Sequence, residues 1–129
     1  MAPARIPTIL TLTLEAPRFN GAVVLHCQGR AISRRDARSL ASLITEVLPT
    51  SKRMVVNLAG VLSLDSDALG KLVLTHMWAE AAGYALKFAS PSNSVRSLFE
   101  STNLVSVFDI YSSVLDALSA MHQEEVLSS

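Results

Sequence analysis

The stretch Ser63–Leu72, with the sequence SLDSDALGKL, is the most informative part of this chain, because it joins an apolar run to a long helical pattern. The run before it, Arg53–Ala59, is apolar on both faces apart from Asn57, which is typical of a central parallel strand. A strand that turns directly into a helix at Asp65 and Ser66 places polar side chains at a helix N-terminus. The unpaired N–H groups and the positive dipole end favour a negative group there.

Two strands are predicted upstream of this junction. Residues Ile9–Glu15 alternate between apolar and polar side chains, which is typical of a half-buried strand near a sheet edge. Pro17, Asn20 and Gly21 indicate a turn. The run Ala22–Gln28 is a second strand, so we expect the two strands to form a hairpin.

A first helix follows the second strand. Gly29–Arg30 ends the strand, and Ser33 with Asp36 three residues later provides the acceptors of a helix start. Pro49–Ser51 is expected to end this helix. Between them, an apolar stripe at helical spacing is formed by Leu40, Leu43, Ile44 and Val47.

The third strand, Met54–Ala59, leads into a helix predicted over Ser66–Ala82, with Gly83 as its C′ residue. The stripe expected to be buried on this helix is Leu69, Leu72, Val73 and Met77, widened by Leu74 and Trp78. A fourth strand over Tyr84–Ala89 is broken by Pro91.

The remainder of the chain predicts two more helices. The spacing of Val95, Leu98 and Phe99 indicates a third helix. A short final strand or an extended segment is expected around Leu104, Val107 and Phe108. Ser112 or Ser113 then caps a last helix that contains Val114, Leu115, Leu118 and Met121, and Gln123–Ser129 is expected to be a frayed tail.

The element order β-β-α-β-α-β-α-(β)-α predicts an α/β fold, with a mixed sheet of four to five strands and about four helices. A length of 129 residues corresponds to a single domain over residues 1–129, with a core over about 8–121 and flexible termini. The amphipathic first strand suggests that one face of the sheet is less covered.

Composition excludes several classes of function. The formal net charge is zero, and the Arg34, Arg35 and Arg38 group is expected to be the wet face of a helix, so nothing indicates direct nucleic-acid binding. A single cysteine, Cys27, excludes an internal disulfide and a cysteine-rich zinc site, and alternation predicts that it is buried. No apolar run approaches the roughly 20 residues of a membrane span and none resembles a signal peptide, so we expect a cytoplasmic location without membrane insertion.

His26, His76 and His122 lie far apart, without the spacing of a metal site, and His76 is expected to be a partly packed histidine. The residues around Ser66 lack the Gly-x-Ser-x-Gly pattern of hydrolases, and no glycine-rich phosphate loop occurs. No catalytic residue, metal ligand or cofactor is therefore predicted.

The motif and the element order resemble the STAS domain, the fold of bacterial anti-sigma-factor antagonists. That family typically carries Asp-Ser-Ser-Gly-Leu-Gly after its third strand, and the matching residues here are Asp65, Ser66, Leu69 and Gly70. Asp67 replaces the second serine and Ala68 replaces the first glycine, for which we expect a helical backbone. The resemblance spans roughly Thr8–Met121.

This resemblance implies a binding module without catalytic chemistry. The partner would be an anti-sigma factor that is also a serine kinase; the unmodified module binds it and the phosphorylated module does not. The phosphorylation site would be Ser66, and the partner-binding residues would be Asp65, Ser66, Asp67 and Leu69. A homodimer is left open.

Three alternatives remain at this stage. Asp65 and Ser66 can be plain helix-capping residues, since Asp and Ser are ordinary at that position. STAS-like proteins also serve as cytoplasmic subunits of lipid or solute ABC transporters, and the changed Asp67–Ala68 pair keeps this role open. A scaffold subunit of a signalling assembly is the third.

Overall fold

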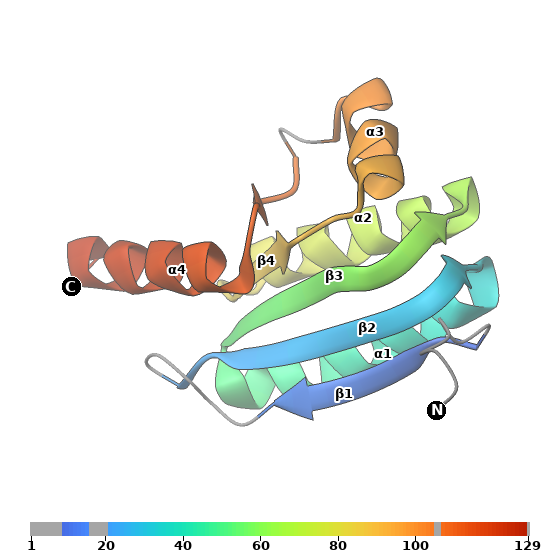
Figure 1. Cartoon of the computed structure of the whole chain (residues 1–129). Helices are drawn as coiled ribbons and strands as arrows, with labels where there is room; N and C mark the ends of the chain where they lie inside the picture. The colour runs from blue at the N-terminus through green and yellow to red at the C-terminus, as the bar shows by residue number, and fades with distance from the viewer. Residues whose placement is uncertain (1–8, 16–20, 105–106, 129) are drawn as a thin grey trace, which may run out of the picture.

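The computed structural model describes residues 9–15, 21–104 and 107–128, and these form one five-stranded sheet flanked by helices (Figure 1). The strands lie side by side in sequence order, with β1 antiparallel to β2 and every other pair of neighbours parallel. They are β1 (Thr11–Glu15), β2 (Val23–Ile32), β3 (Arg53–Leu64), β4 (Ala85–Ala89) and β5 (Ile110–Tyr111). The predicted mixed sheet and the pairing of the first two strands are confirmed; Pro17 and Asn20 of the predicted turn lie outside the described residues.

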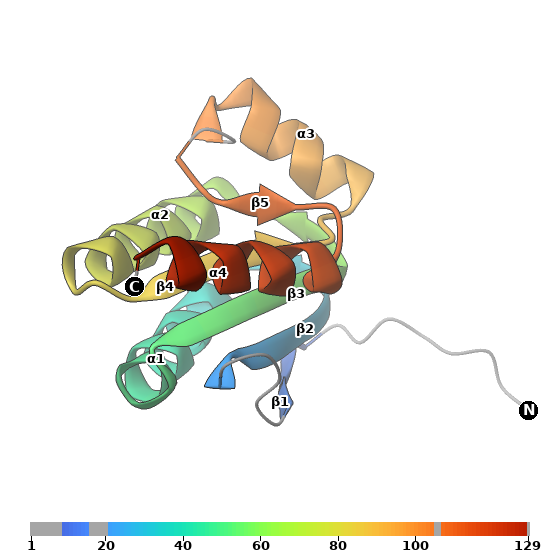
Figure 2. The ribbon, with the colours of Figure 1, turned by 90° about the vertical axis from the view of Figure 1, so that its left-hand side faces the viewer.

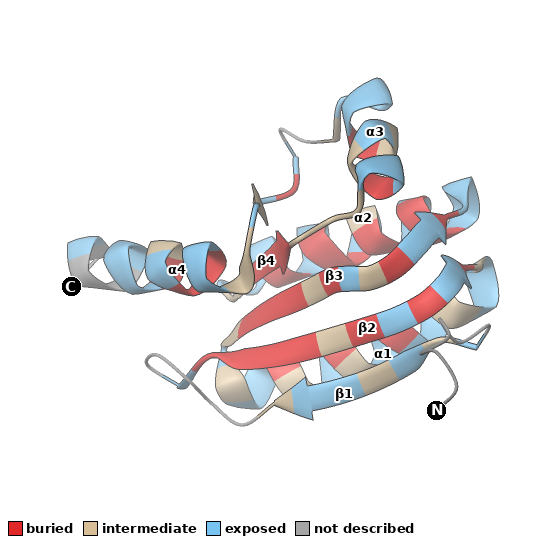
Figure 3. Cartoon of the chain, in the orientation of Figure 1, coloured by how far each residue is buried: buried red, intermediate tan, exposed pale blue. Residues whose placement is uncertain are grey.

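Helices cover both faces of the sheet, unequally (Figure 2). They are α1 (Arg34–Ser51), α2 (Ser66–Ala81), α3 (Asn93–Ser101) and α4 (Val114–Ser128). The first three contribute to the larger core, whereas α4 packs on the opposite face over β3, β4 and β5. That face is less covered at β1, whose residues are exposed or half-buried, as its amphipathic sequence predicted (Figure 3).

Alternation along the central strands produces these two layers. Leu25 on β2 and Met54 and Val56 on β3 point into the larger core, while Val24 and Val55 point toward α4. Because β3 is buried on both faces, it reads as a nearly continuous apolar run.

The two central strands are longer than predicted, because they support each other beyond residue 59. They pair in parallel as far as Ile32 and Leu64, after a register shift between His26 and Gln28. Gly60 permits this shift, since a Cβ there would lie 2.7 Å from the Cys27 carbonyl oxygen. The predicted ends at Gln28 and Ala59 are therefore wrong.

The first helix ends at Ser51, within the stretch predicted to end it, and includes Pro49 in its last turn. In the last turn the missing proline N–H removes only one hydrogen bond. The chain leaves the helix at Lys52, which has a left-handed backbone (φ 66°) and whose N–H bonds the Leu48 carbonyl. The predicted N-cap at Ser33 is confirmed, and Asp36 forms a capping box with it.

The buried face of α2 also differs from the predicted stripe. Leu69 and Leu72 are buried as expected, but Leu74 and Met77 are 62% and 56% exposed. The buried face is instead completed by Ala68, Thr75, His76 and Ala79. His76, at 2% exposure, is fully rather than partly buried.

The C-terminal region differs at two points. The last strand is Ile110–Tyr111, while Phe108 is a core residue that precedes it. Ser113 caps α4, and the helix continues to Ser128, where a frayed tail was expected. Glu124 anchors this last part of α4, because it bonds the Lys87 ammonium at 2.9 Å. No helix in the described residues has the length and apolarity that crossing a bilayer requires.

Candidate functional site

The candidate site is the junction where β3 passes into α2. Asp65 is the N-cap, and its carboxylate accepts a hydrogen bond from the Ala68 N–H at 2.8 Å. The Asp65 N–H in turn donates to the Ile32 carbonyl at 3.1 Å, which joins this turn to the end of β2. The capping interpretation is therefore confirmed for Asp65.

Ser66 is the first residue of α2 and is exposed to solvent. Because Asp65 supplies the cap, the Ser66 hydroxyl is not needed for it, and within the described residues it makes no hydrogen bond. A negative group attached there would be stabilised by the helix N-terminus. The hydroxyl is therefore both accessible and positioned where the fold tolerates a charge.

The other residues of the motif divide between surface and core. Asp67 is exposed in the first turn of α2. Ala68 is helical, as expected, and completely buried. Leu69 is only 5% exposed and belongs to the main core, so its first role is to pack α2 against the sheet. Of the four residues proposed to contact a partner, the structure brings Asp65, Ser66 and Asp67 to the surface.

Two polar clusters lie away from this junction, and sequence reasoning missed both. On the open face of the sheet, His26 lies within hydrogen-bond distance of Glu15 (3.0 Å) and Asn57 (2.8 Å). These residues come from three adjacent strands, and only the strand register reveals that they meet.

The second cluster surrounds Lys87, which is 1% exposed on β4. Its ammonium donates to Asp109 at 3.3 Å and Glu124 at 2.9 Å. Burial alone would lower the pKa of Lys87, but the hydrogen bond to Glu124 and the charges of both carboxylates outweigh it and raise the pKa above its usual value. The lysine thus remains charged and joins β4 to α4.

The single thiol is inert, as its predicted burial implies. Cys27 is 1% exposed, and burial raises its pKa to about 12. A thiol with that pKa holds almost no thiolate at neutral pH, so it is a packing group rather than a nucleophile.

Comparisons with known proteins agree with the fold. Residues 13–117 match the family model described as the STAS domain. A crystal structure of an anti-sigma factor antagonist from Mycobacterium paratuberculosis is 25% identical, has a TM-score of 0.75, and covers 88% of this chain and 95% of its own. The unphosphorylated anti-sigma factor antagonist SpoIIAA is 19% identical, with a TM-score of 0.69 and coverage of 88% and 97%. The phosphorylated Bacillus SpoIIAA is 16% identical, with a TM-score of 0.63 and coverage of 86% and 99%. Among curated protein sequences, none matches the chain significantly.

Proposed function

Because the chain belongs to the STAS domain family, we propose that it is a non-enzymatic regulatory protein that binds an anti-sigma factor with serine-kinase activity in the cytoplasm. Phosphorylation of Ser66 by that kinase ends the binding. The observation that carries this proposal is the exposed Ser66 hydroxyl at the start of α2, which bonds no other described residue and lies next to a helix cap that Asp65 supplies.

The fold and a bound partner would respond differently to a phosphate on Ser66. The modification adds about −1.5 to −2 charges at pH 7. Within the domain, the N-terminus of α2 stabilises that charge, so the fold is retained. A partner packed against the same site would have to desolvate a dianion, and a penalty of ~3 kcal/mol lowers affinity about a hundredfold. Release therefore needs no large rearrangement.

Asp67 adds a fixed charge beside the proposed phosphoacceptor. The helix N-terminus stabilises its carboxylate, and its side chain faces the same cavity as Arg34 and Lys71. A kinase that recognises Ser66 must accommodate this charge, so we expect it to present a cation or a bound Mg²⁺ at this point.

The test is phosphorylation and binding with purified proteins. Each serine-kinase anti-sigma factor of the source organism is mixed in turn with the chain and ATP, and the phosphate is mapped by mass spectrometry. We expect one kinase to bind the unmodified chain and to phosphorylate Ser66. Modification that persists in a Ser66→Ala variant would contradict the assignment.

A charge variant tests the consequence of phosphorylation. Ser66→Asp should lower the affinity for that kinase at least about tenfold, while the melting temperature stays close to that of the wild type. The matched control is Ser119→Asp, which adds the same charge at an exposed position of α4, on the opposite face of the sheet. It should leave the affinity unchanged. Stable association with a transporter ATPase, without modification of Ser66, would instead favour the transporter-subunit role.

A further inference from the structure

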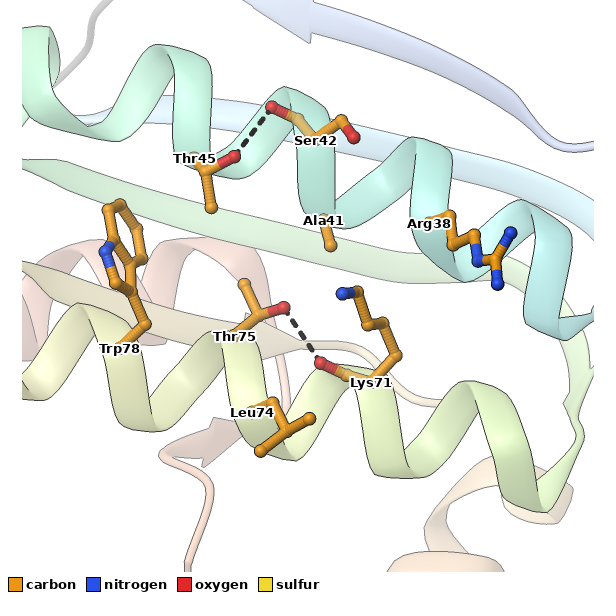
Figure 4. Close-up of a pocket in the computed structure, with 8 residues that line it drawn as sticks. All are labelled: Arg38, Ala41, Ser42, Thr45, Lys71, Leu74, Thr75 and Trp78. Carbon is orange, nitrogen blue, oxygen red and sulfur yellow. Dashed lines mark hydrogen bonds between the residues drawn. The ribbon is translucent and has the colours of Figure 1, made fainter.

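A groove of about 430 Å³ runs between α1 and α2 on the outer surface of the molecule (Figure 4). Its walls are formed by one stripe from each helix, at the spacing of a single helix face. The lining residues are Arg38, Ala41, Ser42, Thr45, Lys71, Leu74, Thr75 and Trp78. The hydroxyls of Thr45 and Thr75 donate hydrogen bonds to carbonyls of their own helices, so these donors are not available to a ligand.

The groove continues toward the Ser66 junction and becomes cationic there. A second cavity shares Arg38, Lys71 and Leu74 with the groove and adds Arg34, Asp67 and Gly70. Within the described residues, none of the three cations, Arg34, Arg38 and Lys71, forms an ion pair. Three cations against one carboxylate leave this end with a net positive charge of two.

Beyond Lys71, the α2 wall of the groove presents exposed apolar side chains. Leu74 is 62% exposed and Trp78 is 36% exposed, and Met77 beside them is 56% exposed. Exposed apolar side chains that cluster beside a groove are typical of protein-binding sites. From Asp67 to Trp78 the α2 wall is about 16 Å long at 1.5 Å per residue, which corresponds to three helical turns.

We infer that this groove binds an acidic amphipathic helix of about three turns, supplied by the same anti-sigma factor kinase that docks at Ser66. The inference rests on the proposed function and adds a second contact to it. The acidic end of that helix would lie along Arg34, Arg38 and Lys71, and its apolar side chains would cover Leu74 and Trp78. Such helix-in-groove recognition combines apolar anchors with charge complementarity.

This arrangement would also strengthen the phosphorylation switch. Ser66 directly precedes Asp67, which lines the cationic end of the groove. The Debye length is about 8 Å at physiological salt, so a phosphate on Ser66 acts on charges bound at that end. It would offset the positive charge that attracts the acidic helix, and release would involve both contacts.

Binding kinetics of the full-length chain with the kinase identified above test the inference. The Arg38→Glu/Lys71→Glu variant should associate about tenfold more slowly, and its association rate should lose the salt dependence that we expect for the wild type between about 50 mM and about 300 mM salt. Leu74→Ala should dissociate at least about threefold faster because it removes an apolar anchor.

Matched controls separate these effects from general loss of charge or apolar surface. Arg35→Glu/Lys52→Glu reverses two positive charges, as the groove variant does, at exposed positions that do not line the groove. Leu115→Ala truncates a leucine on α4 that is 60% exposed. Both controls should bind like the wild type.

The outcomes distinguish the two proposals. A wild-type chain that binds no anti-sigma factor kinase overturns both. A wild-type chain that binds, with rates unchanged in the groove variants, overturns the groove assignment alone. A photo-crosslinker at Ser42 should label an acidic helix of the kinase, and reversing its acidic residues should restore association with the Arg38→Glu/Lys71→Glu variant; labelling of a different surface contradicts the inference.

Discussion

At the scale of single residues, Lys87 is the clearest case of a buried charge whose side-chain volume matters to the packing. It is 1% exposed, yet its ammonium reaches two carboxylates whose side chains are about half exposed, those of Asp109 and Glu124. Removing the ammonium while leaving a cavity should therefore cost more than replacing it with an apolar side chain of similar volume.

We predict that Lys87→Ala lowers the free energy of unfolding by about 2 kcal/mol, whereas Lys87→Met stays within about 1 kcal/mol of the wild type. Urea denaturation monitored by Trp78 fluorescence measures both. Equal losses in the two variants would show that the ion pairs, rather than the filled volume, dominate.

The pH dependence follows from the same contacts. The folded chain holds the pKa of Lys87 above its usual value, so the stabilisation is fully present below the unfolded-state pKa of about 10.4 and is lost as pH rises through the folded value. The stability difference between the wild type and Lys87→Met should therefore be constant near neutral pH. Above about pH 10 the wild type should lose stability relative to Lys87→Met. A difference that changes between pH 6 and pH 8 would assign the effect to other groups.

At the scale of elements, two glycines differ in the space that an added side chain would find. Gly60 lies on β3 where the register with β2 shifts, and a Cβ there would meet the Cys27 carbonyl oxygen at 2.7 Å. Gly70 lies inside α2, and a Cβ there would meet nothing within 4 Å. The strand thus needs its glycine, whereas the helix does not.

We predict that Gly60→Ala destabilises the chain by at least about 2 kcal/mol, because backbone atoms as well as the Gln28 side chain must move. Gly70→Ala is the matched control and should stabilise it by about 0.5–1 kcal/mol. Thermal and urea unfolding measure both effects. If Gly60→Ala left the free energy of unfolding unchanged, the strands could relax from the register shift into a regular ladder.

At the scale of the whole molecule, the sheet and the helices packed on it bury the larger core together. Cys27 lies in the larger core, at 1% exposure, between the sheet and the helices on that face. Its thiol combines burial with a pKa raised to about 12, so only an opening that separates the layers should make it reactive.

We predict that a thiol reagent modifies Cys27 only at the rate of global unfolding, and that added urea accelerates the reaction in proportion to the unfolded fraction. The control is a Ser94→Cys variant, whose additional thiol on the exposed surface of α3 should react at once. Rapid modification of Cys27 in the absence of urea would reveal a local opening of β2.

The sequence by itself determined the element order, the sheet type and the junction at Ser66. Those features depend on local signals: alternation along β1, the Ser33 cap, and the Asp65–Ser66 pair after a strand that is apolar on both faces. Each signal acts within a few residues, so it can be read without knowing what lies opposite.

Only the tertiary structure decided which face of α2 is buried, how far β2 and β3 extend, and where the charges meet. α2 is apolar around most of its circumference, so its sequence does not reveal that Thr75 and His76 are buried while Leu74 and Met77 are exposed. The groove beside Leu74 lies between α1 and α2, which are distant in sequence, and the Lys87 ammonium is paired with Glu124 of α4, which is distant as well. Such features depend on contacts between remote segments, for which local periodicity carries no information.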